Sequence, residues 1–112
     1  DGVADLCADV NNIEQSNELV SALMRISQQQ NVHIICVIHQ NFGSAKLGTG
    51  HLGSALEKKA ETVISLEANT VNKDWTTVKC GRSRGYSFET FSFEVNEKGL
   101  PTIVNDLYDP LK

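Results

Sequence analysis

The sequence has little of what marks several classes of protein. Its three cysteines, Cys7, Cys36 and Cys80, are widely spaced, which fits neither a disulfide framework nor a zinc site. The longest apolar run, residues 34–38, is far too short to span a bilayer, and no secretory signal pattern opens the chain. We therefore expect a cytoplasmic protein without membrane association, whose reduced cysteines act as small apolar residues.

An excess of basic residues is also lacking. Ten lysines and arginines stand against fourteen aspartates and glutamates, so the formal net charge is −4. A domain that holds nucleic acid by bulk charge is usually basic. Any nucleic-acid contact must therefore come from a local patch or from the assembly of several copies. The length of 112 residues allows one domain at most, and 40% hydrophobic residues is ordinary for a globular domain.

The first half of the chain reads as part of a βαβ unit. Apolar residues at helical spacing predict a helix over 13–30, with Asn12 and Gln15 as a capping box or Ser16 as the alternative cap, and with Asn31 as the stop. Residues 32–38 are β-branched and almost continuously apolar, which indicates a strand buried on both faces of a parallel sheet. The preceding parallel strand would end at Asp1.

The second half reads as short elements joined by turns. A Gly-rich loop over 39–53 leads into a helix over 54–61, which Ser54 and Glu57 open as a capping box. A further buried strand is expected over 62–67, and a polar turn over 69–74. An antiparallel meander then follows, with strands over 75–80, 88–95 and 100–104 and a turn over 96–99. Phe91, Phe93 and Val95 would share a face, and Pro101 predicts an edge strand.

Three places could carry chemistry, and each has a plain structural alternative. His39 and Gln40 follow the central strand, where open α/β sheets bind ligands, but they could simply cap that strand and begin a loop. Lys46 and His51 lie in the Gly-rich loop, which could contact nucleic acid or be merely flexible. That loop contains no G-x-x-x-x-G-K-[ST], so it is not a P-loop.

The third place is the basic stretch 79–85. Lys79, Arg82 and Arg84 are three cations within six residues, expected on a Gly-flanked turn between two strands. Guanidinium forks suit bidentate contact with phosphate. The alternative is a solvated hairpin tip.

These segments, taken in order, resemble a known family. Residues 1–6 look like the tail of a Walker B strand, and residues 16–24 look like the helix that follows it in RecA-type ATPases. Residues 37–41 match the end of their next core strand. The last two segments, 52–66 and 78–93, are similar to the helix-plus-strand and the late hairpin of DnaB-type and RepA-type replicative helicases, with plasmid and mobile-element versions nearest.

The resemblance implies an α/β fold. It consists of a partial RecA-like three-layer core, in which parallel strands and a helix precede a C-terminal antiparallel meander. Residues 1–112 would be the C-terminal fragment of a RecA-like ATPase domain, because the family's phosphate-binding loop and catalytic glutamate would lie upstream of Asp1. We expect the fragment alone to be inactive in ATP turnover, and to self-associate. Its parent would be an ATP-dependent hydrolase that binds ATP and Mg²⁺, acts on single-stranded DNA in replication or mobile elements, and assembles into a hexameric ring or a filament.

The resemblance also implies roles for individual residues. Asp1 would hold magnesium and so contribute to nucleotide binding, and His39 or Gln40 would sense the γ-phosphate. Lys46 and His51 would contact the DNA backbone. Lys79 and an arginine finger would reach the ATP of a neighbouring subunit. Family hairpins often read K-x-R-x-G, whereas Lys79 here is separated from Arg82 and Arg84, so either arginine is eligible and we favour Arg84.

Two other functions stay open from the sequence. A non-motor regulatory or partitioning ATPase could use the same core. A plain interaction domain without nucleotide chemistry is the second alternative, and the sequence upstream of Asp1 would decide between it and an ATPase.

Overall fold

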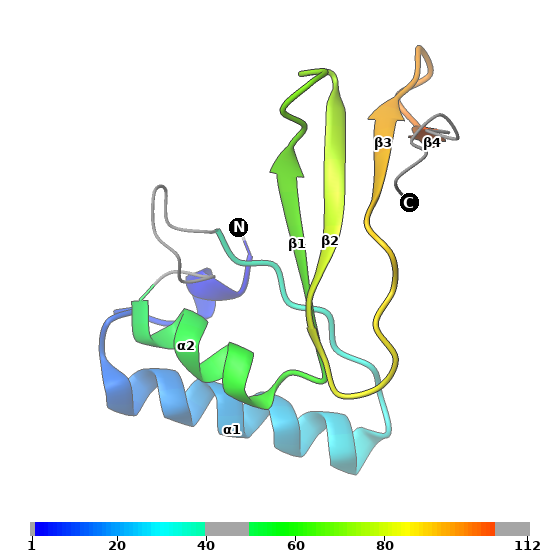
Figure 1. Cartoon of the computed structure of the whole chain (residues 1–112). Coiled ribbons are helices and arrows are strands. Elements are labelled where there is room, and N and C mark those ends of the chain that lie inside the picture. Colours follow the sequence, from blue (N-terminus) through cyan, green and yellow to red (C-terminus); the bar gives the residue numbers. More distant parts are fainter. Residues whose placement is uncertain (1, 40–49, 105–112) are drawn as a thin grey trace. The chain divides into compact units, whose positions relative to one another are not determined.

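The computed structural model describes residues 2–39 and 50–104, and the chain divides into two compact units, Asp1–Ala60 and Glu61–Lys112 (Figure 1). The first unit contains a 3-10 helix η1 (Val3–Leu6) and the helices α1 (Ile13–Gln30) and α2 (Gly50–Lys59). The second contains the strands β1 (Thr62–Ala68), β2 (Trp75–Ser83), β3 (Phe91–Val95) and β4 (Pro101–Val104). Among the described residues, no helix is both long and apolar enough to cross a membrane.

Helix α1 has the bounds that the sequence predicts, but its cap is only half of a capping box. The Oδ1 atom of Asn12 accepts a hydrogen bond from the Gln15 N–H at 2.9 Å, and Asn31 ends the helix in the left-handed region with φ of 52°. The Gln15 Oε1 atom, however, accepts from the Asp9 N–H at 3.0 Å rather than from Asn12. The Asn12 N–H instead donates to the Asp9 carbonyl oxygen at 3.0 Å. Asn12, and not the fully buried Ser16, is the N-cap residue.

Helix α2 begins four residues earlier than predicted, so Ser54 lies inside it and does not cap it. Its start is fixed by a segment far away in the sequence, because the Leu52 N–H donates to the Val10 carbonyl oxygen at 3.0 Å. Gly50 makes this approach possible. Its φ is 64°, and a Cβ atom there would lie 2.8 Å from the Val10 oxygen.

The core of the first unit is small and lies where α1 and α2 pack together. Val3, Val20 and Leu52 are its buried residues, and Leu52 has no exposed surface. Partly buried apolar residues surround them: Ala4, Cys7, Val10, Leu19, Leu23, Ile38, Ala55 and Leu56. This packing explains the apolar stripe along the 13–30 helix.

Residues 32–39 form no strand, and the predicted buried strand is wrong for the described chain. Ile35 is 81% exposed and Val37 is 66% exposed, because none of the described strands pairs with this segment. It makes a backbone contact with the start of the chain, since the Val3 N–H donates to the Val37 carbonyl oxygen at 3.0 Å. The described residues therefore combine helices with an antiparallel sheet, and they contain no parallel RecA-like core.

The second unit is an antiparallel sheet in the order β1-β2-β3-β4, so the meander predicted from residue 75 onward is confirmed and also includes the strand before it (Figure 1). Asn69 Oδ1 accepts from the N–H groups of Val71 and Asn72 at 2.9 Å, which builds the expected turn before β2. Strand β4 begins with Pro101 at the edge of the sheet, as predicted. The expectation that the strand over 62–67 is buried is wrong. It is the other edge strand, and Ile64 is 57% exposed.

The pairing register assigns each side chain of the sheet to one of two faces. Phe91, Phe93 and Val95 share one face, as predicted, and Val78 lies opposite Phe91 on that face. The other face carries Thr77 and Ser92, which lie opposite each other and are both buried. We call the first the apolar face and the second the polar face.

Candidate functional site

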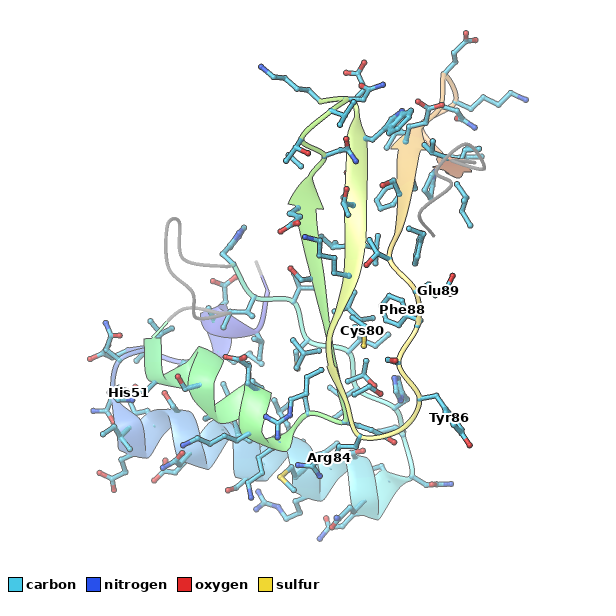
Figure 2. The ribbon with its side chains drawn as sticks, in the orientation of Figure 1. His51, Cys80, Arg84, Tyr86, Phe88 and Glu89 are labelled. Atoms are coloured by element: carbon cyan, nitrogen blue, oxygen red, sulfur yellow. The ribbon has the colours of Figure 1, made fainter. Side chains whose placement is uncertain are left out.

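The basic stretch lies mainly on strand β2 and not on a turn. Strand β2 continues to Ser83, so Lys79 and Arg82 are strand residues and the predicted Gly-flanked turn is wrong. The reason is that strand β1 pairs with β2 as far as Thr62, opposite Ser83. The chain leaves the sheet only after this point. Figure 2 labels Arg84 near the end of β2 and Tyr86 farther along the segment that leads to β3.

A β-bulge at Gly81 divides the basic stretch. Ile64 of β1 lies opposite Cys80, but the preceding residue Val63 lies opposite Arg82, so the ladder passes over Gly81. A residue added to one strand reverses the alternation of side chains beyond it. Arg82 therefore lies on the face that also carries Lys79.

Arg84, the residue after the end of β2, is also hydrogen-bonded to the segment that precedes β1. Its N–H donates to the Glu61 carbonyl oxygen at 2.9 Å, so one backbone hydrogen bond joins the two segments just beyond the strand ends at Thr62 and Ser83. Arg84 is two residues beyond Arg82, so alternation keeps it on the same face. Three cations thus share the polar face, and this is the best candidate site among the described residues.

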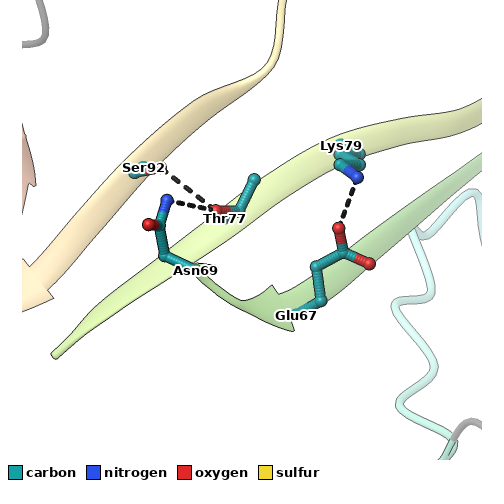
Figure 3. Close-up of polar contacts among 5 residues, drawn as sticks. All are labelled: Glu67, Asn69, Thr77, Lys79 and Ser92. Carbon is teal, nitrogen blue, oxygen red and sulfur yellow. Dashed lines mark hydrogen bonds and ion pairs between the residues drawn. The ribbon is translucent and has the colours of Figure 1, made fainter. Parts of the chain in front are cut away.

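Lys79 makes an ion pair on this face. Its Nζ atom contacts Glu67 Oε1 of the neighbouring strand β1 (Figure 3). The two side chains are 49% and 43% exposed, and an exposed pair of this kind contributes about 0–1 kcal/mol. The contact orients Lys79 across the β1–β2 pair without contributing much to stability.

Hydroxyl and amide groups fill the polar face beside Lys79. The Thr77 and Ser92 hydroxyl oxygens are 3.3 Å apart, and the Asn69 Nδ2 atom donates to Thr77 Oγ1 at 3.0 Å (Figure 3). The buried Thr77 and Ser92 hydroxyl groups therefore have hydrogen-bond partners, link β2 to β3, and are poor candidates for reactive groups.

The remaining predicted site residues are dispersed. His39 is exposed at the end of the described 32–39 segment, and His51 is exposed in the first turn of α2, not in a loop (Figure 2). Asp1, Gln40 and Lys46 lie outside the described residues. The first unit therefore offers no assembled site within residues 2–39 and 50–60.

Metal and thiol chemistry find little support in the described chain. Over 2–39 and 50–104 there is no group of three or more His, Cys, Asp or Glu side chains placed to hold a metal ion. Partial burial raises the pKa of the Cys36 thiol, which makes it a weaker nucleophile at neutral pH. An open hollow on the surface of α1 is lined by residues of that helix alone: Glu14, Asn17, Glu18, Ser21 and Arg25.

The three cations are evident in the sequence, but the bulge that brings them to one face is not. A lone glycine inside an alternating strand pattern is the signal that could have found it. Comparison of the chain with protein-family models, with curated proteins and with solved structures gave no match.

Proposed function

We propose that the chain is the C-terminal part of a RecA-like, ATP-dependent DNA motor, and that Lys79, Arg82 and Arg84 act on the nucleotide of a neighbouring subunit. The observation that carries the proposal is the common face of these three cations beside the bulge at Gly81. Phosphoryl transfer needs positioned positive charge more than covalent help. A cluster of one lysine and two arginines supplies that charge in a chain whose net charge is −4.

A second observation supports the same proposal. The hydrogen bond from the Val3 N–H to the Val37 carbonyl oxygen brings the residues after Asp1 beside the residues before His39. Gly2 allows this approach, because its φ is 84° and a Cβ atom there would lie 2.7 Å from the Val37 oxygen. In a RecA-like site, a magnesium-binding aspartate and a phosphate-sensing residue end two neighbouring strands. The contact is consistent with that arrangement.

The proposed parent would explain why apolar residues of the segment 32–38 are exposed in the described chain. Ile35 and Val37 belong to a segment with the composition of a central strand, yet they are exposed in the described chain. In the proposed parent, further strands would pair with residues 32–38, and helices packed on the two faces of that sheet would cover these side chains. ATP would be held by that parent with Mg²⁺, to which Asp1 would contribute. His39 or Gln40 would sense the γ-phosphate, while Lys46 and His51 would contact single-stranded DNA.

The test is ATP hydrolysis by the full-length parent with Arg82→Ala, Arg84→Ala and the double variant. A finger contributes roughly 10³ to 10⁵ in rate, so we expect the double variant to lower DNA-stimulated kcat about a thousandfold or more. Lys98→Ala, which removes an exposed cation from the β3–β4 turn, is the matched control and should leave kcat unchanged. Intact hydrolysis in the double variant would contradict the proposal. Hydrolysis without strand displacement by the unaltered parent would favour a non-motor ATPase.

A further inference from the structure

The β1–β2 ladder carries one residue more on β2 than on β1 over the basic stretch. On β1, Thr62 and Ile64 are two residues apart, whereas their partners on β2, Ser83 and Cys80, are three residues apart. If β2 were regular over this stretch, Arg82 and Arg84 would lie on the apolar face, opposite Lys79. The side to which both guanidinium groups point therefore depends on where the extra residue is placed.

We propose that the bulge at Gly81 is a positioning feature that keeps Arg82 and Arg84 on the face of Lys79, so that the three bind one oligophosphate together. The inference rests on the proposed function and extends it. It makes both arginines members of one site, and it assigns their orientation to the bulge. Gly81 itself has no side chain to contact the ligand.

Charge and burial favour this face for an anion. The Lys79 side chain is about half exposed, and an oligophosphate would compete with the Glu67 carboxylate for its ammonium group. Several cations on one face attract an oligophosphate more strongly than separated charges do, and guanidinium forks add directed hydrogen bonds. The apolar face instead carries Ile64 and Leu66, which offer no hydrogen bonds to phosphate.

A deletion in β2 and an insertion in β1 would each remove the bulge, but they place the two arginines on opposite faces of the sheet. Deletion of Gly81 makes the ladder regular and leaves Arg82 opposite Val63, so all three cations stay on one face. Insertion of a serine between Val63 and Ile64 also makes the ladder regular, because the new residue lies opposite Gly81. In that variant Arg82 and Arg84 turn to the apolar face, although no residue of β2 has changed.

The experiment is an NMR titration of the 112-residue chain with tripolyphosphate at low salt. We expect the apparent Kd of the Gly81 deletion to stay within about twofold of the unaltered chain. The serine insertion should weaken binding about tenfold or more, as should Arg82→Ala combined with Arg84→Ala. Equal effects of the deletion and the insertion would overturn the proposal, since a bulge with only a structural role predicts that result.

A pair of charge relocations tests the same claim without a change of length, should the insertion variant not fold. Lys79→Ala with Ser65→Lys moves the cation to the residue directly opposite, on the same face. Lys79→Ala with Cys80→Lys moves it to the adjacent residue, on the apolar face. We expect the first variant to retain tripolyphosphate binding and the second, which keeps only the two arginines on the polar face, to bind more weakly, and equal binding would contradict the proposal.

The outcomes separate this inference from the proposed function. If the double arginine variant of the parent keeps its ATP hydrolysis, the proposed function fails, whatever the titration shows. If that variant loses hydrolysis but the deletion and the insertion behave alike, only the role of the bulge is wrong.

Discussion

Val63 lies opposite Arg82 in the β1–β2 ladder, although regular pairing from Ile64 and Cys80 would place it opposite Gly81. This shift of one residue turns Arg82 to the face that carries Lys79. It also accounts for the uneven spacing of the cations in the basic stretch, where Arg82 follows Lys79 by three residues and Arg84 follows Arg82 by two. Without the bulge residue, the order from Lys79 onward becomes lysine, cysteine, arginine, serine, arginine, in which every second residue is a cation.

The ion pair between Lys79 and Glu67 should matter for orientation and little for stability. We expect Glu67→Gln to change the free energy of unfolding by no more than about 1 kcal/mol at low salt, because both side chains are nearly half exposed. The difference should shrink in 1 M salt, which screens exposed charges. Denaturant unfolding with a Lys79→Met and Glu67→Gln double-mutant cycle measures it. A coupling energy above about 2 kcal/mol would show that the pair is structural.

Gly50 should be the glycine least tolerant of substitution among Gly50, Gly85 and Gly99. Gly50→Ala meets both a positive φ and the Val10 carbonyl oxygen, whereas Gly99→Ala meets a positive φ with no atom within 4 Å. We expect Gly99→Ala to destabilise its unit by about 1–2 kcal/mol and Gly50→Ala to destabilise the first unit by clearly more. Gly85→Ala, with open space and no positive φ, is the control. Thermal unfolding followed by circular dichroism compares the three variants, and equal losses for Gly50 and Gly99 would contradict the close approach.

Asn12 should be the residue that starts α1. Asn12→Ala removes the acceptor for the Gln15 N–H and should lower the free energy of unfolding by about 0.5–2 kcal/mol. Asn12→Asp retains the acceptor and should stay close to the unaltered chain. Urea unfolding measures both variants. If the two substitutions have equal effects, Asn12 does not cap the helix.

The sequence predicts an element of this fold well when the residues that determine the element lie close together in the chain. Helix α1 is predicted residue by residue because its stripe and both of its ends lie within residues 12–31. The start of α2 is not, because it depends on the Val10 carbonyl oxygen, forty residues before Gly50. The strand over 32–38 is predicted from composition alone, and composition cannot supply the neighbouring strands that a buried strand needs.

The candidate site shows the same division. The three cations, and the general suitability of guanidinium groups for phosphate, can be read from the residue types. The face on which they lie cannot, because it depends on how Val63 and Ile64 pair with β2. Gly81 indicates a bulge from the sequence, but only the pairing register shows that the bulge changes the face on which Arg82 lies.

The central claim, that these cations act across a subunit boundary on ATP, is tested most directly by mixing two inactive variants of the parent. One carries Arg82→Ala and Arg84→Ala, and the other carries Asp1→Ala at the proposed magnesium site. Each alone should hydrolyse ATP poorly. In mixed assemblies an intact Asp1 site can face an intact arginine pair, so we expect the mixture to recover a substantial part of the DNA-stimulated hydrolysis. A mixture no more active than its separate components would contradict action on a neighbouring subunit.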